Sequence, residues 1–144
     1  MRTSHVLLLL AATFSVSGCP NKTNQVPEVM GLLTENGIPA GGVQVRFSVL
    51  QEPEHNEPPK ETLTIETTTA INGSFSFERS EKWMFVPPVP VDYSYLWETC
   101  FEAPGSDPVC GLYRTPGRPG APDFIYMKCD LENEQLCEIS FLRP

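Results

Sequence analysis

Histidine is scarce in this sequence of 144 residues, which contains only His5 and His55. Histidine is the commonest general base in enzymes and a common metal ligand, so its scarcity restricts both kinds of site. The chain also lacks a Gly-x-Ser-x-Gly nucleophile motif and a glycine-rich loop that would hold a phosphate. We therefore expect a protein that is not an enzyme, with no cofactor and no bound metal.

Basic residues are also few, since ten lysines and arginines stand against 18 aspartates and glutamates. The resulting formal net charge of −8 disfavours contact with nucleic-acid phosphates and with anionic lipid headgroups. We therefore expect no nucleic-acid partner.

Long apolar runs are missing except at the N-terminus, where Arg2 is followed by an uncharged stretch from Val6 to about Val16. This run is about half the ~20 residues that a membrane-spanning helix needs. A basic start, an apolar middle and small residues at the end are typical of a secretory signal peptide. Residues 1–18 are therefore predicted to be a signal peptide, residues 19–25 a tether without regular structure, and residues 26–144 a folded domain.

The four residues Val16-Ser17-Gly18-Cys19 resemble the bacterial lipobox, in which a small residue precedes a lipidated cysteine. The resemblance implies cleavage before Cys19, a diacylglyceryl group on its sulfur and a palmitate-type acyl chain on its new amino group. Several acyl chains anchor a protein stably where one does not. The chain would then face the periplasm, and Pro20, which is not the aspartate linked with inner-membrane retention, favours the outer membrane. An ordinary signal peptide with an incidental cysteine is the alternative.

The remaining four cysteines form an even set, which in an exported chain predicts two disulfides. No two of them have the two-to-four-residue spacing of a structural zinc site. Four cysteines allow three pairings, and we favour the two with the shortest loops because these close at the least entropic cost. The predicted bonds are Cys100–Cys110 and Cys129–Cys137.

Apolar residues alternate with polar ones along much of the chain, and no segment shows the 3.6-residue period of a helix. Seven or eight short strands are predicted, which indicates an all-β sandwich or barrel. Asn36-Gly37 and Asn72-Gly73 are strong turn signals, so residues 62–78 are predicted to form a hairpin. Residues 103–122 contain five prolines and four glycines and are predicted to be a long irregular loop.

Two stretches, NGIPAGGVQV (36–45) and TTTAINGSFSF (67–77), resemble the carboxypeptidase regulatory-like and transthyretin-like β-sandwich domains. The resemblance covers residues 29–78, and it departs from the family where Ala70 and Ile71 replace residues that are often acidic. It implies a Greek-key sandwich of about seven strands that serves as an accessory or binding module, with no chemistry of its own.

Two groups of residues are candidates for binding a partner. Trp83 and Trp97 bound a dense aromatic run, which we expect to lie mostly in the core, with some members exposed. Arg114 and Arg118 lie in the predicted loop and are suited to an acidic partner surface. We expect a non-catalytic protein-binding module, either an envelope assembly component or an inhibitor of the immunity type. A carbohydrate- or peptidoglycan-binding module that uses exposed aromatics is the alternative.

Overall fold

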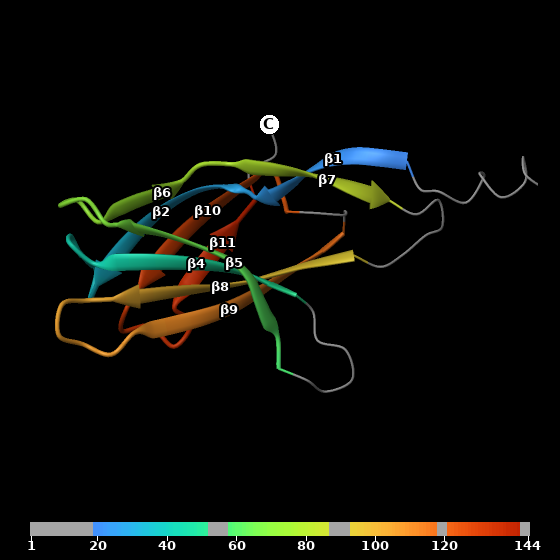
Figure 1. Ribbon diagram of the computed structural model, residues 1–144. Helices are drawn as coiled ribbons and strands as arrows, with labels where there is room; N and C mark the ends of the chain where they lie inside the picture. The colour runs from blue at the N-terminus through green and yellow to red at the C-terminus, as the bar shows by residue number, and fades with distance from the viewer. Residues whose placement is uncertain (1–18, 52–57, 87–92, 118–120, 142–144) are drawn as a thin grey trace, which may run out of the picture.

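The computed structural model describes residues 19–51, 58–86, 93–117 and 121–141, and the predicted signal peptide lies outside these ranges (Figure 1). The described residues form eleven strands and no helix. Accordingly, no helix in this part of the chain is long and apolar enough to span a membrane. The strands are β1 (Cys19–Val26), β2 (Glu28–Glu35), β3 (Ile38–Pro39), β4 (Gln44–Gln51), β5 (Lys60–Thr68), β6 (Ser74–Phe77), β7 (Ser80–Val86), β8 (Tyr93–Glu102), β9 (Val109–Gly117), β10 (Phe124–Asp130) and β11 (Cys137–Ser140).

Two sheets enclose one hydrophobic core and confirm the all-β, sandwich-like class. One sheet has the order β5-β4-β8-β9, and the other has the order β11-β10-β2, with both β3 and β6 paired to β2. Strands β2 and β10 run parallel, whereas the other pairs are antiparallel. Phe47 meets Phe77 and Phe75 meets Phe101 across the interior, with ring centroids 5.8 and 5.7 Å apart. These rings join the two sheets because period-two alternation points them inward from both sides.

The predicted hairpin over residues 62–78 is wrong. Strand β5 pairs with β4, whereas β6 pairs with β2 in the opposite sheet. The Asn72-Gly73 turn exists, with Gly73 at a φ of 76°, but it carries the chain from one sheet to the other. Crossing the core places Phe75 and Phe77 against the aromatic rings of the facing sheet. A turn dipeptide specifies that the chain reverses, and it leaves open which strand the next segment pairs with.

The predicted irregular loop over residues 103–122 is also wrong between residues 109 and 117. Strand β9 pairs with β8 along nine residue pairs, from Tyr93↔Gly117 to Phe101↔Val109. Pro116 is tolerated because β9 is an edge strand, where one side of the backbone has no ladder partner to lose. Gly111 leaves room for the Tyr113 ring, since a Cβ there would lie 2.4 Å from the tyrosine hydroxyl oxygen.

The tether predicted over residues 19–25 is instead strand β1, which pairs with β7. The pairs Val26↔Ser80 and Val29↔Phe77 share one register, so β1–β2 and β6–β7 form one long antiparallel ladder with a bulge between Asn24 and Val26. Figure 1 shows the β1–β7 part extending beyond the sandwich. We call the two strands β1 and β7 the arm.

The bulge at the base of the arm is held from two sides. The buried hydroxyl of Tyr95 donates a hydrogen bond to the Gln25 carbonyl at 3.0 Å. Burial raises the pKa of Tyr95, so this hydroxyl keeps its proton. On the other side the Ala121 amide donates to the Asn24 carbonyl at 2.8 Å, and the Asn24 side chain donates to Asp123. The base of β1 is therefore fixed by its backbone carbonyls and by the Asn24 side chain.

Candidate functional surfaces

Three turns lie at the end of the sandwich opposite the arm, which we call the distal end (Figure 1). They follow β2, β5 and β8 at residues 36–37, 69–73 and 103–108. The first is a two-residue hairpin turn in which Asn36 and Gly37 both have positive φ, 54° and 78°. This is the geometry that the Asn-Gly dipeptide favours, so the predicted turn at Asn36-Gly37 is confirmed.

The buried side chain of Thr69 ties the distal segments together. Its hydroxyl donates to the Ala40 carbonyl at 2.8 Å and accepts from the Val43 amide at 2.9 Å. The Thr69 carbonyl also accepts from the Gly42 amide at 3.0 Å, and the Gly73 carbonyl accepts from Leu33 at 2.8 Å. Because these bonds join segments from different strands, they fix the backbone of the distal end.

Asp130 fixes the neighbouring turn from the end of β10. Its carboxylate accepts hydrogen bonds from the Thr34 hydroxyl at 2.8 Å, from the Gly37 amide at 2.9 Å and from the amides of Asn36 and Glu132. These donors, the Thr34 hydroxyl first, lower the pKa of Asp130 because they bind the charged form. One carboxylate therefore joins the β2–β3 turn to the adjacent strand.

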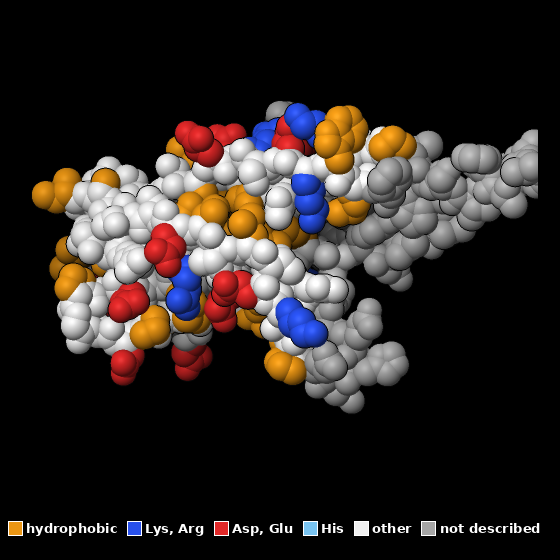
Figure 2. All heavy atoms as spheres, viewed as in Figure 1, with side chains coloured by type: hydrophobic (Ala, Val, Ile, Leu, Met, Phe, Trp, Pro, Cys, Tyr) orange, Lys and Arg blue, Asp and Glu red, His pale blue; other side chains and the backbone are white. Residues whose placement is uncertain are grey.

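Large apolar side chains protrude from this fixed backbone. Ile71 is 95% exposed and Ile38 is 69% exposed. Figure 2 shows hydrophobic side chains gathered at the end where these turns lie. Neither isoleucine was predicted to bind a partner, although each is adjacent to an Asn-Gly dipeptide. An apolar residue beside a turn dipeptide was the available signal, because tight turns lie at the surface.

Two disulfides also lie toward the distal end, and both predicted pairings are confirmed. Cys100 is bonded to Cys110 and Cys129 to Cys137, each across a strand pair with Cα atoms 4.0 Å apart. The second bond is buried in the core, whereas Cys110 is exposed on the outer face of its sheet.

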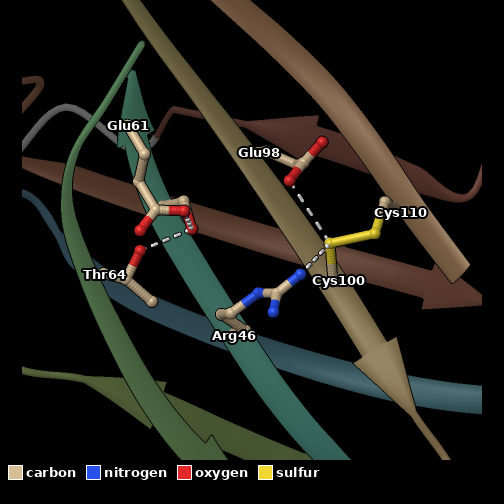
Figure 3. Close-up of a disulfide and its surroundings, with 7 residues drawn as sticks. Arg46, Glu61, Thr64, Glu98, Cys100 and Cys110 are labelled. Atoms are coloured by element: carbon tan, nitrogen blue, oxygen red, sulfur yellow. Dashed lines mark hydrogen bonds between the residues drawn. A yellow bond between two sulfur atoms is a disulfide. The ribbon is translucent and has the colours of Figure 1, made fainter. Parts of the chain in front are cut away.

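The exposed disulfide lies between charged groups on the outer face of the four-stranded sheet (Figure 3). Arg46 Nη2 donates to Cys100 Sγ at 3.5 Å, and Glu98 Oε2 lies 3.5 Å from the same sulfur. Glu98, Cys100 and Cys110 are close enough together to suggest metal ligands, the one such group of three in the described chain. The two sulfurs are bonded to each other, so they present no thiolate to a metal.

The residues predicted to bind a partner are scattered over the molecule. Trp97 is 1% exposed and stacks between Phe47 and Tyr113, so it belongs to the core and presents no surface. Trp83 is 72% exposed on the arm, and Cys19 is the first residue of that arm. Arg114 is exposed on β9 opposite Leu96, where it interacts with other residues. Arg118 lies outside the described residues.

Comparison with known proteins leaves the family open. No protein-family model, no curated protein and no solved structure matches this chain. The geometry therefore carries the functional conclusion, and it points to two surfaces, the distal end with its exposed isoleucines and the arm with Trp83.

Proposed function

We propose that this chain is a lipid-anchored protein of the bacterial cell envelope, acylated at Cys19, that acts as a non-catalytic protein-binding module. It faces the periplasm, and the outer membrane is the favoured site. The observation that carries the proposal is the distal end, where Ile71 and Ile38 protrude from turns held by Thr69 and Asp130.

The energetics of association favour this end as a contact surface for a protein. Burying apolar surface contributes about 25 cal/mol per Å². A partner that covers the two exposed isoleucines therefore stabilises the complex. A fixed backbone also reduces the conformational entropy that is lost on binding. The Thr69 and Asp130 hydrogen bonds supply that fixed backbone before any partner arrives.

The position of the anchor suits a partner in the periplasm. Strands β1 and β2 run from Cys19 to Glu35, and at about 3.3 Å per residue they span up to about 50 Å. A lipid on Cys19 would allow the distal turns to lie at any distance up to that length from the bilayer. An envelope assembly component and an immunity-type inhibitor both fit this placement.

The fold proposal is a transthyretin-like sandwich. It rests on the resemblance of residues 29–78 to carboxypeptidase regulatory-like domains, and both Asn-Gly turns of that stretch adopt positive φ. Accessory domains of this kind bind partners and carry no catalytic groups. The alternative of a carbohydrate-binding module relied on exposed aromatics, and the burial of Trp97 removes one of its two tryptophans.

Site-specific crosslinking tests the protein-binding proposal. A photo-crosslinking amino acid at position 71 or 38 should give one adduct of the same mass in intact cells. The matched control is position 76, because Ser76 is exposed on β6 away from the turns. No adduct at 71 and 38, or equal adducts at 76, would contradict the proposal.

Substitutions give an independent readout of the same surface. Ile71→Asp should abolish the adduct formed at position 38 and leave the melting temperature unchanged, because the side chain makes little contact with the fold. Replacing Arg114 and Arg118 with alanine should lower only the salt sensitivity of partner capture, as expected of rim charges.

A further inference from the structure

The arm presents a large aromatic side chain that no other strand of the described residues covers. Trp83 is 72% exposed and lies opposite Lys22 in the β1–β7 ladder. Above the bulge, these two strands pair only with each other among the described strands. A two-stranded ribbon alone is marginally stable in water, so the arm gains from any surface that covers it.

The charge of the arm is opposite to that of the whole chain. Strands β1 and β7 carry Lys22, Lys82 and Glu81, while the full sequence has an excess of eight acidic residues. Lys22 forms an ion pair with Glu81, and Lys82 lies opposite Thr23. Figure 2 shows blue and orange side chains together at this end of the described surface. An anionic bilayer would therefore attract the arm and repel the acidic remainder of the chain.

The register also brings Trp83 close to the anchoring residue. Lys22 is three residues from Cys19, so its partner Trp83 lies about 10 Å along the ladder from the first residue of the arm. Each headgroup layer of a bilayer is about 5–8 Å thick, the difference between its hydrocarbon and total dimensions. A steep inclination of the arm toward the bilayer surface would bring Trp83 inside that layer. Tryptophan is enriched there because its ring is apolar and its N–H is polar.

We propose that the arm is a membrane-docking element, and that Trp83 inserts into the headgroup layer of the bilayer that holds the Cys19 lipid. The inference rests on the proposed lipid anchor and adds an orientation to it. The arm lies against the membrane, and the distal end points away from it. The lipid alone would leave the domain free to tilt, whereas a second contact 10 Å away along the ladder restricts that motion.

Tryptophan fluorescence tests this docking directly, since Trp83 and Trp97 are the two tryptophans of the chain. The full acylated protein is reconstituted into vesicles of phosphatidylethanolamine and phosphatidylglycerol, with and without brominated phosphatidylcholine. We expect brominated lipid to remove most of the Trp83 emission, with a blue shift and protection from acrylamide. Trp83→Phe, which leaves only buried Trp97, should abolish the lipid-dependent loss.

A matched probe at the other end tests the orientation. In the Trp83→Phe background, Ile71→Trp places the same fluorophore on the exposed distal turn. This probe should stay open to acrylamide and insensitive to brominated lipid. Quenching of both probes by lipid would overturn the orientation, because the domain would then lie flat on the bilayer.

The remaining outcomes separate the inference from the proposed function. If intact mass shows no acyl groups, the anchor fails and the docking inference fails with it. If the protein is acylated but Trp83 stays open to acrylamide, the anchor stands and the docking is wrong. Protection from acrylamide without quenching by brominated lipid also overturns docking, because a second copy of the chain would then cover the arm.

Discussion

The two ends of the long ladder are built from the same strands and held in different ways. At the distal end, the turns after β2 and β5 are held by the Asp130 and Thr69 hydrogen bonds, with two disulfides nearby. At the other end, β1 and β7 are held by their own ladder and a Lys22–Glu81 ion pair above the bulge. The difference is consistent with the two proposals above, in which the firmly held end binds a protein and the more lightly held end contacts a membrane. Four sets of substitutions test whether the distal end is held more firmly than the arm.

Removing the buried disulfide should have the largest effect. Both bonds close short loops, with sequence separations of 8 and 10, so loop entropy contributes roughly 2.5–3 kcal/mol to each. Cys129 and Cys137 also pack in the core, so Cys129→Ala with Cys137→Ala should cost about 3–5 kcal/mol. The matched variant, Cys100→Ala with Cys110→Ala, should cost less. Urea unfolding measures the free energy of unfolding of both double variants. Equal losses would show that the burial of Cys129 and Cys137 adds nothing to the effect of the disulfide itself.

Gly73→Ala should come next, because the new side chain meets backbone. A Cβ at Gly73 would lie 2.3 Å from the Leu33 carbonyl oxygen, at a φ of 76°. We expect a loss of about 2–4 kcal/mol. Gly42→Ala is the control, since its φ of 77° is nearly the same but nothing lies within 4 Å. That variant should lose only about 1–2 kcal/mol of conformational strain. Similar melting temperatures for the two variants would contradict the close approach of Gly73 to the Leu33 backbone.

Asp130 should give the distal end a specific acid sensitivity. Its pKa is lower in the folded protein than the ordinary value of 3.8, so the unfolded chain takes up the proton first as the pH falls. The stabilisation is complete above about pH 5, begins to fall as the unfolded chain takes up the proton, and is lost as the pH drops through the lower, folded pKa. Asp130→Asn should lower the melting temperature at pH 7. It should also weaken the fall of the melting temperature between about pH 5 and pH 2, which thermal melts at a series of pH values would measure. Glu134→Gln, a nearby exposed change, should leave that limb as it is.

The ion pair on the arm should matter least. A double-mutant cycle with Lys22→Ala and Glu81→Ala should give a coupling of only about 0.2–1 kcal/mol, because both side chains are largely in water. Added salt should reduce the coupling further. A coupling as large as the effect at Gly73 would mean that the arm is as firmly held as the distal end, and the contrast between the ends would disappear.

Most local features were predictable because they depend on near neighbours in the chain. Alternation predicted the inward faces of β4 and β6, and Asn36-Gly37 predicted a turn with positive φ. The disulfide pairings followed from loop length alone. Sequence reasoning failed where partners are distant. β1 pairs with a strand about 60 residues later, so the polar composition of residues 19–25 looked like a tether.

The candidate surfaces were only partly foreseen. Trp83 was selected together with Trp97, and the sequence did not show that Trp97 on β8 would be buried and Trp83 on β7 exposed. Exposure of Ile71 and Ile38 depends on where the turns end up relative to the sandwich. This exposure is set by how the strands pack in three dimensions, and the spacing of residues in the sequence does not predict it.

The sequence by itself determined the all-β class, the turn at Asn36-Gly37 and the two disulfide pairings. Each depends on backbone preferences or on residues close together in the chain. Only the tertiary structure decided that β5 and β6 lie in opposite sheets, that residues 109–117 form an edge strand and that β1 and β7 make an arm. These outcomes depend on which distant strand completes each ladder and which face the core covers, and both are settled by packing the whole chain.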